Sequence, residues 1–168
     1  SEIKKTIDAS SKNHKIPFSV FKVTGLGPLS ILEIANEGLE KLSIDQKGEY
    51  NKIKDRIDEI CKYSFTKDVP ILIDAEDSWI QGTIDRMVEK MMCRYNQSKV
   101  IVYTTIQFYR WDRLEYLTKL QEDSLKLNYK LGIKLVRGAY MEKERHRAEV
   151  MGYQDPIQKT KKDTDSDF

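Results

Sequence analysis

Hydrophobic and polar residues alternate along this chain with two periods, one typical of strands and one typical of helices. Short apolar or β-branched runs predict strands over residues 17–24, 71–76, 99–105 and 133–138. Apolar residues that recur every three or four positions predict helices over residues 2–13, 29–42, 46–65, 79–95, 111–129 and 139–150. Strands that alternate with long helices indicate βαβ units, in which the strands run parallel to one another.

The number of these units decides the predicted fold class. A whole (β/α)8 barrel needs ~250 residues, whereas this chain has 168 residues and four predicted strands. We therefore predict an α/β fold, a partial (β/α)8 (TIM-like) barrel of about four parallel βα units, in preference to a small open sheet. Residues 1–15 are expected to form a helical lead-in, residues 16–152 the partial barrel, and residues 153–168 a polar, frayed or disordered tail at a truncation point.

Composition narrows the class of protein. Hydrophobic residues make up 39% of the chain and charged residues 33%, which is typical of a globular protein with a polar surface. The net charge of +2 gives no electrostatic reason to expect nucleic acid as a partner. No apolar run approaches the ~20 residues that a membrane-spanning helix requires.

Cysteine and histidine usage points away from disulfide and metal chemistry. Cys61 and Cys93 are not spaced as a CxxC motif, so we expect two reduced thiols. The two histidines, His14 and His146, lie among charged residues, and no metal site is predicted. The charged run from Glu142 to Arg147 is expected to form a solvated helix face with pairs four residues apart.

Polar side chains stand at the ends of all four predicted strands. In chain order they are Lys22, Asp74 with Glu76, Gln107 with Tyr109, and Lys134 with Arg137 and Tyr140. Because the carboxyl ends of parallel strands meet at one edge of a sheet, these side chains should share one rim. Acids, an amide and bases together would suit an anionic, ring-shaped ligand. For any single residue, a strand-end charge that simply reaches solvent is an equally good interpretation.

Four segments of this rim resemble the FAD-dependent proline dehydrogenases. They are Val20-Phe21-Lys22-Val23-Thr24, Ile73-Asp74-Ala75-Glu76, Gln107-Phe108-Tyr109 and Lys134-Leu135-Val136-Arg137-Gly138-Ala139-Tyr140, and the resemblance spans residues 16–168. It implies a distorted (β/α)8 barrel that holds FAD at the carboxyl ends of its strands. It also implies oxidation of L-proline to Δ1-pyrroline-5-carboxylate, on the route from proline to glutamate. Hydride would pass to flavin N5 and electrons to a membrane quinone.

The resemblance assigns roles to individual residues. Lys22 matches the lysine that pairs with the proline carboxylate, Asp74 the active-site aspartate beneath it, and Tyr140 a tyrosine near the substrate. Gln107 matches a glutamine that hydrogen-bonds the flavin. These residues are the predicted catalytic and cofactor contacts nearest the substrate.

The fourth segment implies further flavin contacts by Lys134, Val136, Arg137, Gly138 and Ala139. Gly138 would let the backbone approach the ligand closely. Many bacterial members read Arg-Leu-Val-Lys-Gly-Ala-Tyr here, and their first arginine bonds flavin N5. Lys134 takes that place in this chain and Arg137 replaces the lysine, as in the branch that includes the mitochondrial enzymes. A lysine cannot reproduce the two-pronged contact of an arginine.

Other family features have no counterpart here. The family's last barrel helix carries a Tyr-x-x-Arg-Arg motif that closes over the substrate carboxylate, and this sequence contains none. We therefore expect the 168-residue chain by itself to be inactive and to bind FAD weakly or not at all. The resemblance also implies a cytoplasmic protein held peripherally at the inner membrane, on the matrix side of the mitochondrion in a eukaryote.

Two other interpretations stay open at this point. Lys22 or Lys134 could be the Schiff-base amine of a lyase or aldolase barrel, which requires a lysine of lowered pKa. Alternatively, the chain could be a non-catalytic α/β domain that survives by oligomerising. Half a barrel leaves two open sheet edges and an apolar inner face, so we expect the fragment to form a homo-oligomer, a dimer or larger.

Overall fold

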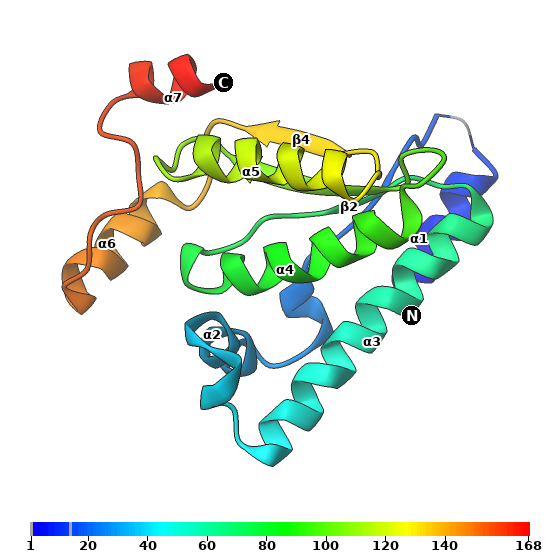
Figure 1. The fold of residues 1–168 in the computed structure, drawn as a ribbon, viewed down its shortest axis with the longest axis horizontal. Helices are drawn as coiled ribbons and strands as arrows, with labels where there is room; N and C mark the ends of the chain where they lie inside the picture. Colours follow the sequence, from blue (N-terminus) through cyan, green and yellow to red (C-terminus); the bar gives the residue numbers. More distant parts are fainter. Residues whose placement is uncertain (1, 14) are drawn as a thin grey trace.

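The structure is a computed structural model that describes residues 2–13 and 15–168, so the interpretation of His14 lies outside the described residues. A parallel sheet forms its centre, with long helices packed along it, and α6 and α7 lie at the opposite end of the molecule from α1 (Figure 1). In chain order the elements are α1 (Glu2–Ser11), β1 (Ser19–Phe21), the 3-10 helix η1 (Val23–Leu26), α2 (Leu29–Glu37), the 3-10 helix η2 (Leu39–Lys41), α3 (Ile44–Lys67), β2 (Ile71–Ile73), α4 (Ser78–Tyr95), β3 (Val102–Gln107), α5 (Arg113–Lys126), β4 (Ile133–Val136), α6 (Met141–Met151) and α7 (Lys161–Asp167). Within the described ranges, no helix is both long and apolar enough to span a bilayer.

The four strands pair in the order β1-β2-β3-β4, and each pair is parallel. The prediction of an α/β fold made of parallel βα units is therefore confirmed. Register places Phe21 beside Ile73 and Thr105 beside Lys134. Since successive side chains of a strand point to opposite faces, register decides which residues of different strands share a face.

One face of the sheet builds the core with the helices. Ile71 and Ile73 of β2 and Ile106 of β3 are almost fully buried, as are Ile84 and Val88 of α4. The other face is more open: Val20 of β1 has 48% of its surface exposed, and the exposed Phe18 ring meets Tyr103 edge-on at 5.5 Å. An open, partly apolar face is what a partial barrel exposes.

The C-terminal residues differ from the prediction of a frayed tail. Ile157 is buried and forms an antiparallel bridge with Arg110, and the helix α7 begins with a capping box between Thr160 and Asp163. The cause is local: one apolar side chain anchors the segment, and the Thr160 cap satisfies the first backbone donors of the helix. The predicted helix over residues 29–42 also differs, because it breaks at Gly38 between α2 and η2.

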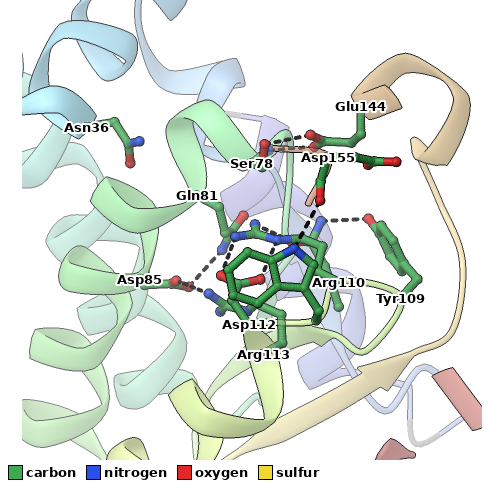
Figure 2. Close-up of polar contacts among 12 residues, drawn as sticks. Asn36, Ser78, Gln81, Asp85, Tyr109, Arg110, Asp112, Arg113, Glu144 and Asp155 are labelled. Carbon is green, nitrogen blue, oxygen red and sulfur yellow. Dashed lines mark hydrogen bonds and ion pairs between the residues drawn. The ribbon is translucent and has the colours of Figure 1, made fainter. Parts of the chain in front are cut away.

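The apolar positions of the predicted helix over residues 111–129 are Leu114, Leu117, Leu120 and Leu125, yet the buried side of α5 is largely polar. Leu114 and Leu125 are exposed, and of the leucines expected to face the core only Leu120 is buried. The helix instead buries Arg113, whose Nη1 donates to Asp85 Oδ2 of α4 at 2.9 Å (Figure 2). Each side chain of this pair is only 4% exposed. This ion pair and the hydrogen bond from Tyr116 Oη to Glu89 at 2.8 Å join α5 to α4.

Replacing Arg113 with methionine should strongly destabilise the fold. The change removes the charge but keeps a long side chain, and it leaves the Asp85 carboxylate buried with only the amide of Gln81 as a partner. We expect a loss of about 3–5 kcal/mol in the free energy of unfolding, measured by urea denaturation. Lys119→Met, at an exposed position of the same helix, is the control and should change it by less than about 0.5 kcal/mol. A loss below about 1 kcal/mol for Arg113→Met would mean that the pair contributes no more than a surface ion pair.

Candidate active site

A row of charged side chains crosses the open face of the sheet at the carboxyl ends of its strands. Asp74, directly after β2, lies between two lysines: Lys134 Nζ is 2.6 Å from Asp74 Oδ1, and Lys22 Nζ is 3.6 Å from Asp74 Oδ2. The Asp74 side chain is 21% exposed, so it is partly shielded from water, whereas Lys22 and Lys134 are 45% and 40% exposed. The predicted convergence of these three residues is found.

The strand register explains how residues from three strands meet. Thr105 pairs with Lys134, and the registers of β1, β2 and β3, continued just past the ends of β1 and β2, align Lys22 and Asp74 with them, so these side chains share one face. Lys134 lies two strands from Asp74, and the residue between them is the small Thr105, which bonds back to the Ile73 carbonyl at 3.1 Å. Because Thr105 is small and turned aside, the long lysine chain can pass over it to the carboxylate.

Tyr140 closes one side of the row. Lys22 Nζ donates a hydrogen bond of 3.0 Å to Tyr140 Oη and lies 5.6 Å from the centre of its ring. Tyr140 has φ of 41°, in the left-handed region that residues other than glycine seldom adopt. Such backbone strain is found most often where a side chain must be aimed at a site.

The charge state of Lys22 follows from these neighbours. Partial burial lowers the pKa of Lys22, but the hydrogen bond to Tyr140 and the attraction of Asp74 and Glu76 outweigh it, so the pKa is raised. Lys22 is therefore a protonated cation near neutral pH. A Schiff-base nucleophile needs the opposite shift, which argues against the lyase interpretation for this lysine.

Glu76 and Gln107 are buried behind the row and are bonded within the chain. Glu76 accepts hydrogen bonds from the Thr24 backbone N–H at 3.0 Å and the Thr24 hydroxyl at 2.5 Å. Gln107 Nε2 donates to the Glu76 carbonyl at 2.7 Å and to Tyr109 Oη at 2.8 Å, and its Oε1 accepts from Arg110 at 3.3 Å. Glu76 and Tyr109, expected at the rim, thus brace the loops beneath it.

The end of β4 reaches the same rim but joins the row only through Lys134. Val136 is half-buried beside Gln107, and Gly138 and Ala139 are exposed. A side chain added at Gly138 would meet only Met141 Sδ, at 3.5 Å, so the backbone there is open to an approaching ligand. Arg137 points away: its Nη1 donates to Asp165 at 3.0 Å, and its guanidinium lies over the Phe168 ring.

Glu144 is a buried residue near the site that the sequence pattern did not predict. Glu144 belongs to the charged run read as a solvated face, yet it is fully buried, and its carboxylate accepts two hydrogen bonds from Ser78 (Figure 2). No sequence pattern identified it, because periodicity shows where apolar side chains are buried and Glu144 is charged. Among residues 2–13 and 15–168, no group of three acidic, histidine or cysteine side chains is arranged to hold a metal ion.

Comparison with known proteins places this geometry in a family. A family model described as proline dehydrogenase matches residues 1–168. Mitochondrial proline dehydrogenase 2 of Arabidopsis thaliana is 36% identical over 154 residues, which are 90% of this chain and 32% of the relative. Hydroxyproline dehydrogenase of Xenopus laevis is 33% identical over 136 residues, which are 79% of this chain and 29% of the relative. The chain thus spans about a third of the length of these curated relatives.

A solved structure shows the same fold. A mutant of proline utilization A from Bradyrhizobium japonicum superposes with a TM-score of 0.78 at 18% sequence identity, covering 98% of this chain and 17% of that chain. This likeness confirms the predicted partial barrel. With the match of the family model along its whole length, it leads to one conclusion: the chain belongs to the proline dehydrogenase family.

Proposed function

We propose that this chain is the part of an FAD-dependent oxidoreductase that binds L-proline, and that the intact protein oxidises L-proline to Δ1-pyrroline-5-carboxylate. The observation that carries the proposal is the row of Lys22, Asp74 and Lys134 on the open face. Two ammonium groups and one carboxylate give the row itself a net positive charge, while the nearby Glu76 carboxylate is bonded to Thr24. An amino-acid carboxylate would compensate that charge.

Lys22 is the residue that we propose holds the substrate carboxylate. Its ammonium group has three N–H donors, of which one bonds Tyr140, and its side chain is still 45% exposed. Asp74 lies beneath Lys22, and its carboxylate holds the Lys22 ammonium group in position. Tyr140 excludes water from one side of the ammonium and limits where a ring can lie. The raised pKa of Lys22 keeps it cationic throughout the neutral range.

The residues beside this row fit a flavin. Val136 offers an apolar surface, and the exposed backbone at Gly138 and Ala139 admits a flat ring at close range. When bound, FAD would accept the hydride from the proline ring and pass the electrons on to a membrane quinone. Both N–H groups of Gln107 are bonded within the chain, so it would meet a flavin N–H through the free lone pair of its Oε1.

The two basic residues of the fourth segment would differ in how they contact FAD. Lys134 uses one N–H for Asp74 and keeps two for a ligand, so it can offer the flavin a single-pronged contact. Arg137 is assigned to the flavin by its position in the family motif. It would first have to leave Asp165 and Phe168.

The proposal also covers where the protein is found in the cell and whether the chain associates with copies of itself. The Arabidopsis relative is named as mitochondrial, and in a eukaryote we place this protein at the matrix face of the inner membrane, where quinone is available. In a bacterium the corresponding place is the cytoplasmic face. The exposed Phe18 and Val20 on the open face would also favour self-association of this chain when it is on its own.

The intact protein should be yellow, and L-proline should bleach it. We expect the visible flavin band to fall when purified protein, loaded with FAD under anaerobic conditions, is titrated with L-proline. The enantiomer D-proline is the matched control and should leave the band unchanged. A parallel titration with hydroxyproline tests the substrate that the name of the Xenopus relative states. Protein that retains no flavin after FAD loading would contradict the proposal.

Lys22→Met should weaken proline binding while leaving the fold intact. The change removes one charged hydrogen-bond donor, a contact typically worth about 1.5–3 kcal/mol. We therefore expect the KM for L-proline to rise by about 10- to 100-fold. Lys47→Met, on the exposed side of α3, is the control and should behave like the wild type. An unchanged KM for Lys22→Met would remove Lys22 from the substrate site.

A further inference from the structure

The helix α6 carries Tyr140 at its start but has almost no apolar contact with the rest of the molecule. Its buried residues are Glu144 and Ala148, and both Val150 and Met151 are exposed. An alanine methyl buries too little apolar surface to hold an eleven-residue helix in place. Polar contacts must therefore position α6.

Glu144 makes the most buried of these contacts. It is 0% exposed, and its Oε1 and Oε2 accept hydrogen bonds from the backbone N–H and the hydroxyl of Ser78 at 2.6 and 2.5 Å (Figure 2). Ser78 is the first residue of α4, and the side chain of Asp77 before it makes no capping bond. The carboxylate of one helix thus caps the positive end of another, where an anion is favoured.

The other polar contacts of α6 are weaker. Lys143 Nζ is 2.7 Å from Asp77 Oδ2, but the lysine side chain is 58% exposed. Arg147 lies over the Trp79 ring at 4.2 Å and reaches Glu33 only at 3.5 Å. These contacts are only partly buried, with Arg147 and Glu33 34% and 33% exposed, so water and salt screen them more than the contact of Glu144. Removing Glu144, by contrast, would leave the Ser78 N–H without its acceptor.

This contact joins two loops of the candidate site. Ser78 lies four residues after Asp74, while the backbone N–H of Glu144 donates to the Tyr140 carbonyl at 2.9 Å. The strands before these loops, β2 and β4, are not neighbours in the sheet. Tyr140 also lies beyond the end of β4 at Val136, so sheet hydrogen bonds do not by themselves fix the distance between Asp74 and Tyr140.

We propose that Glu144 is a positioning residue: its buried carboxylate clamps α6 to the start of α4 and so holds the Tyr140 phenol beside Lys22. The kinetic consequence rests on the proposed proline oxidation, whereas the clamp itself does not. If the clamp is lost, α6 shifts outward and the strained backbone at Tyr140 relaxes. The phenol then leaves the Lys22 ammonium.

The first test is kinetic and uses the intact, FAD-loaded protein. Glu144→Ala should lower kcat/KM for L-proline by about 10- to 100-fold, the scale of loss from a small displacement of a site group. Glu142→Ala, on the exposed side of the same helix, is the matched control and should keep wild-type kinetics. Glu144→Gln keeps one carbonyl oxygen for the Ser78 N–H and should restore most of the activity, even if the alanine variant folds poorly.

The decisive comparison adds Tyr140→Phe. If Glu144 acts through the Tyr140 hydroxyl, the replacements Glu144→Gln and Glu144→Ala should cost no further activity in protein that already carries Tyr140→Phe. Fully multiplicative losses would mean that Glu144 supports only the general stability of the fold, and would overturn the proposal.

A second test does not depend on turnover. Backbone hydrogen exchange of the intact protein, resolved by peptide, should accelerate over residues 140–151 and at Ser78 in Glu144→Ala, with β2 and β3 unchanged. Glu142→Ala should exchange like the wild type. Equal exchange in the two variants would overturn the clamp. If the wild type neither holds flavin nor oxidises proline, the proposed function fails, and hydrogen exchange still decides whether Glu144 anchors α6.

Discussion

The contact of Asp74 with Lys22 and Lys134 is the constraint on which the rest of the site depends. Two ammonium groups on one face of a sheet repel each other unless an anion lies between them. Asp74 supplies that anion at 2.6 and 3.6 Å, and it can do so because register puts all three residues on the same face. The central carboxylate makes the two cations compatible, and their excess charge remains for an anionic ligand.

Behind this row, two buried carboxylates hold the loops that follow the strands in place. Glu76 holds the turn after β1 through Thr24, and Glu144 holds the turn after β4 through Ser78. Both carboxylates accept two hydrogen bonds, which makes their burial tolerable. Parallel strands fix the positions of side chains within the sheet but not those of the loops beyond it. Two buried carboxylates compensate for this: Glu76 joins the loop after β2 to the turn after β1, and Glu144 joins the helix after β4 to the start of α4.

The row of Lys22, Asp74 and Lys134 could be predicted from the sequence. The buried polar contacts that support it could not. Lys22, Asp74 and Lys134 follow apolar runs whose period and direction were readable, so their meeting at one rim followed from the fold class. The burial of Glu144 and Arg113 was not predicted, because periodicity reports where apolar side chains are buried, and a buried charge leaves no such trace. The partner of Glu144 is 66 residues away in the chain, and no local pattern identifies it. Ile157 was missed for a related reason, since a single apolar residue has no period.

Lys134 and Arg137 stand in the reverse order of the arginine and lysine found in many bacterial members. The contacts of the two residues give this order a physical explanation. Lys134 must pass over Thr105 and meet one oxygen of Asp74, for which a compact ammonium on a flexible stem is well suited. Arg137 instead lies against a flat ring and a carboxylate, Phe168 and Asp165, and a planar guanidinium suits both. An arginine at position 134 would bring a rigid planar fork to the single carboxylate oxygen that Lys134 meets, and a lysine at position 137 would set a strongly hydrated point charge on an aromatic ring. The order Lys then Arg therefore matches the surroundings of each position in this chain.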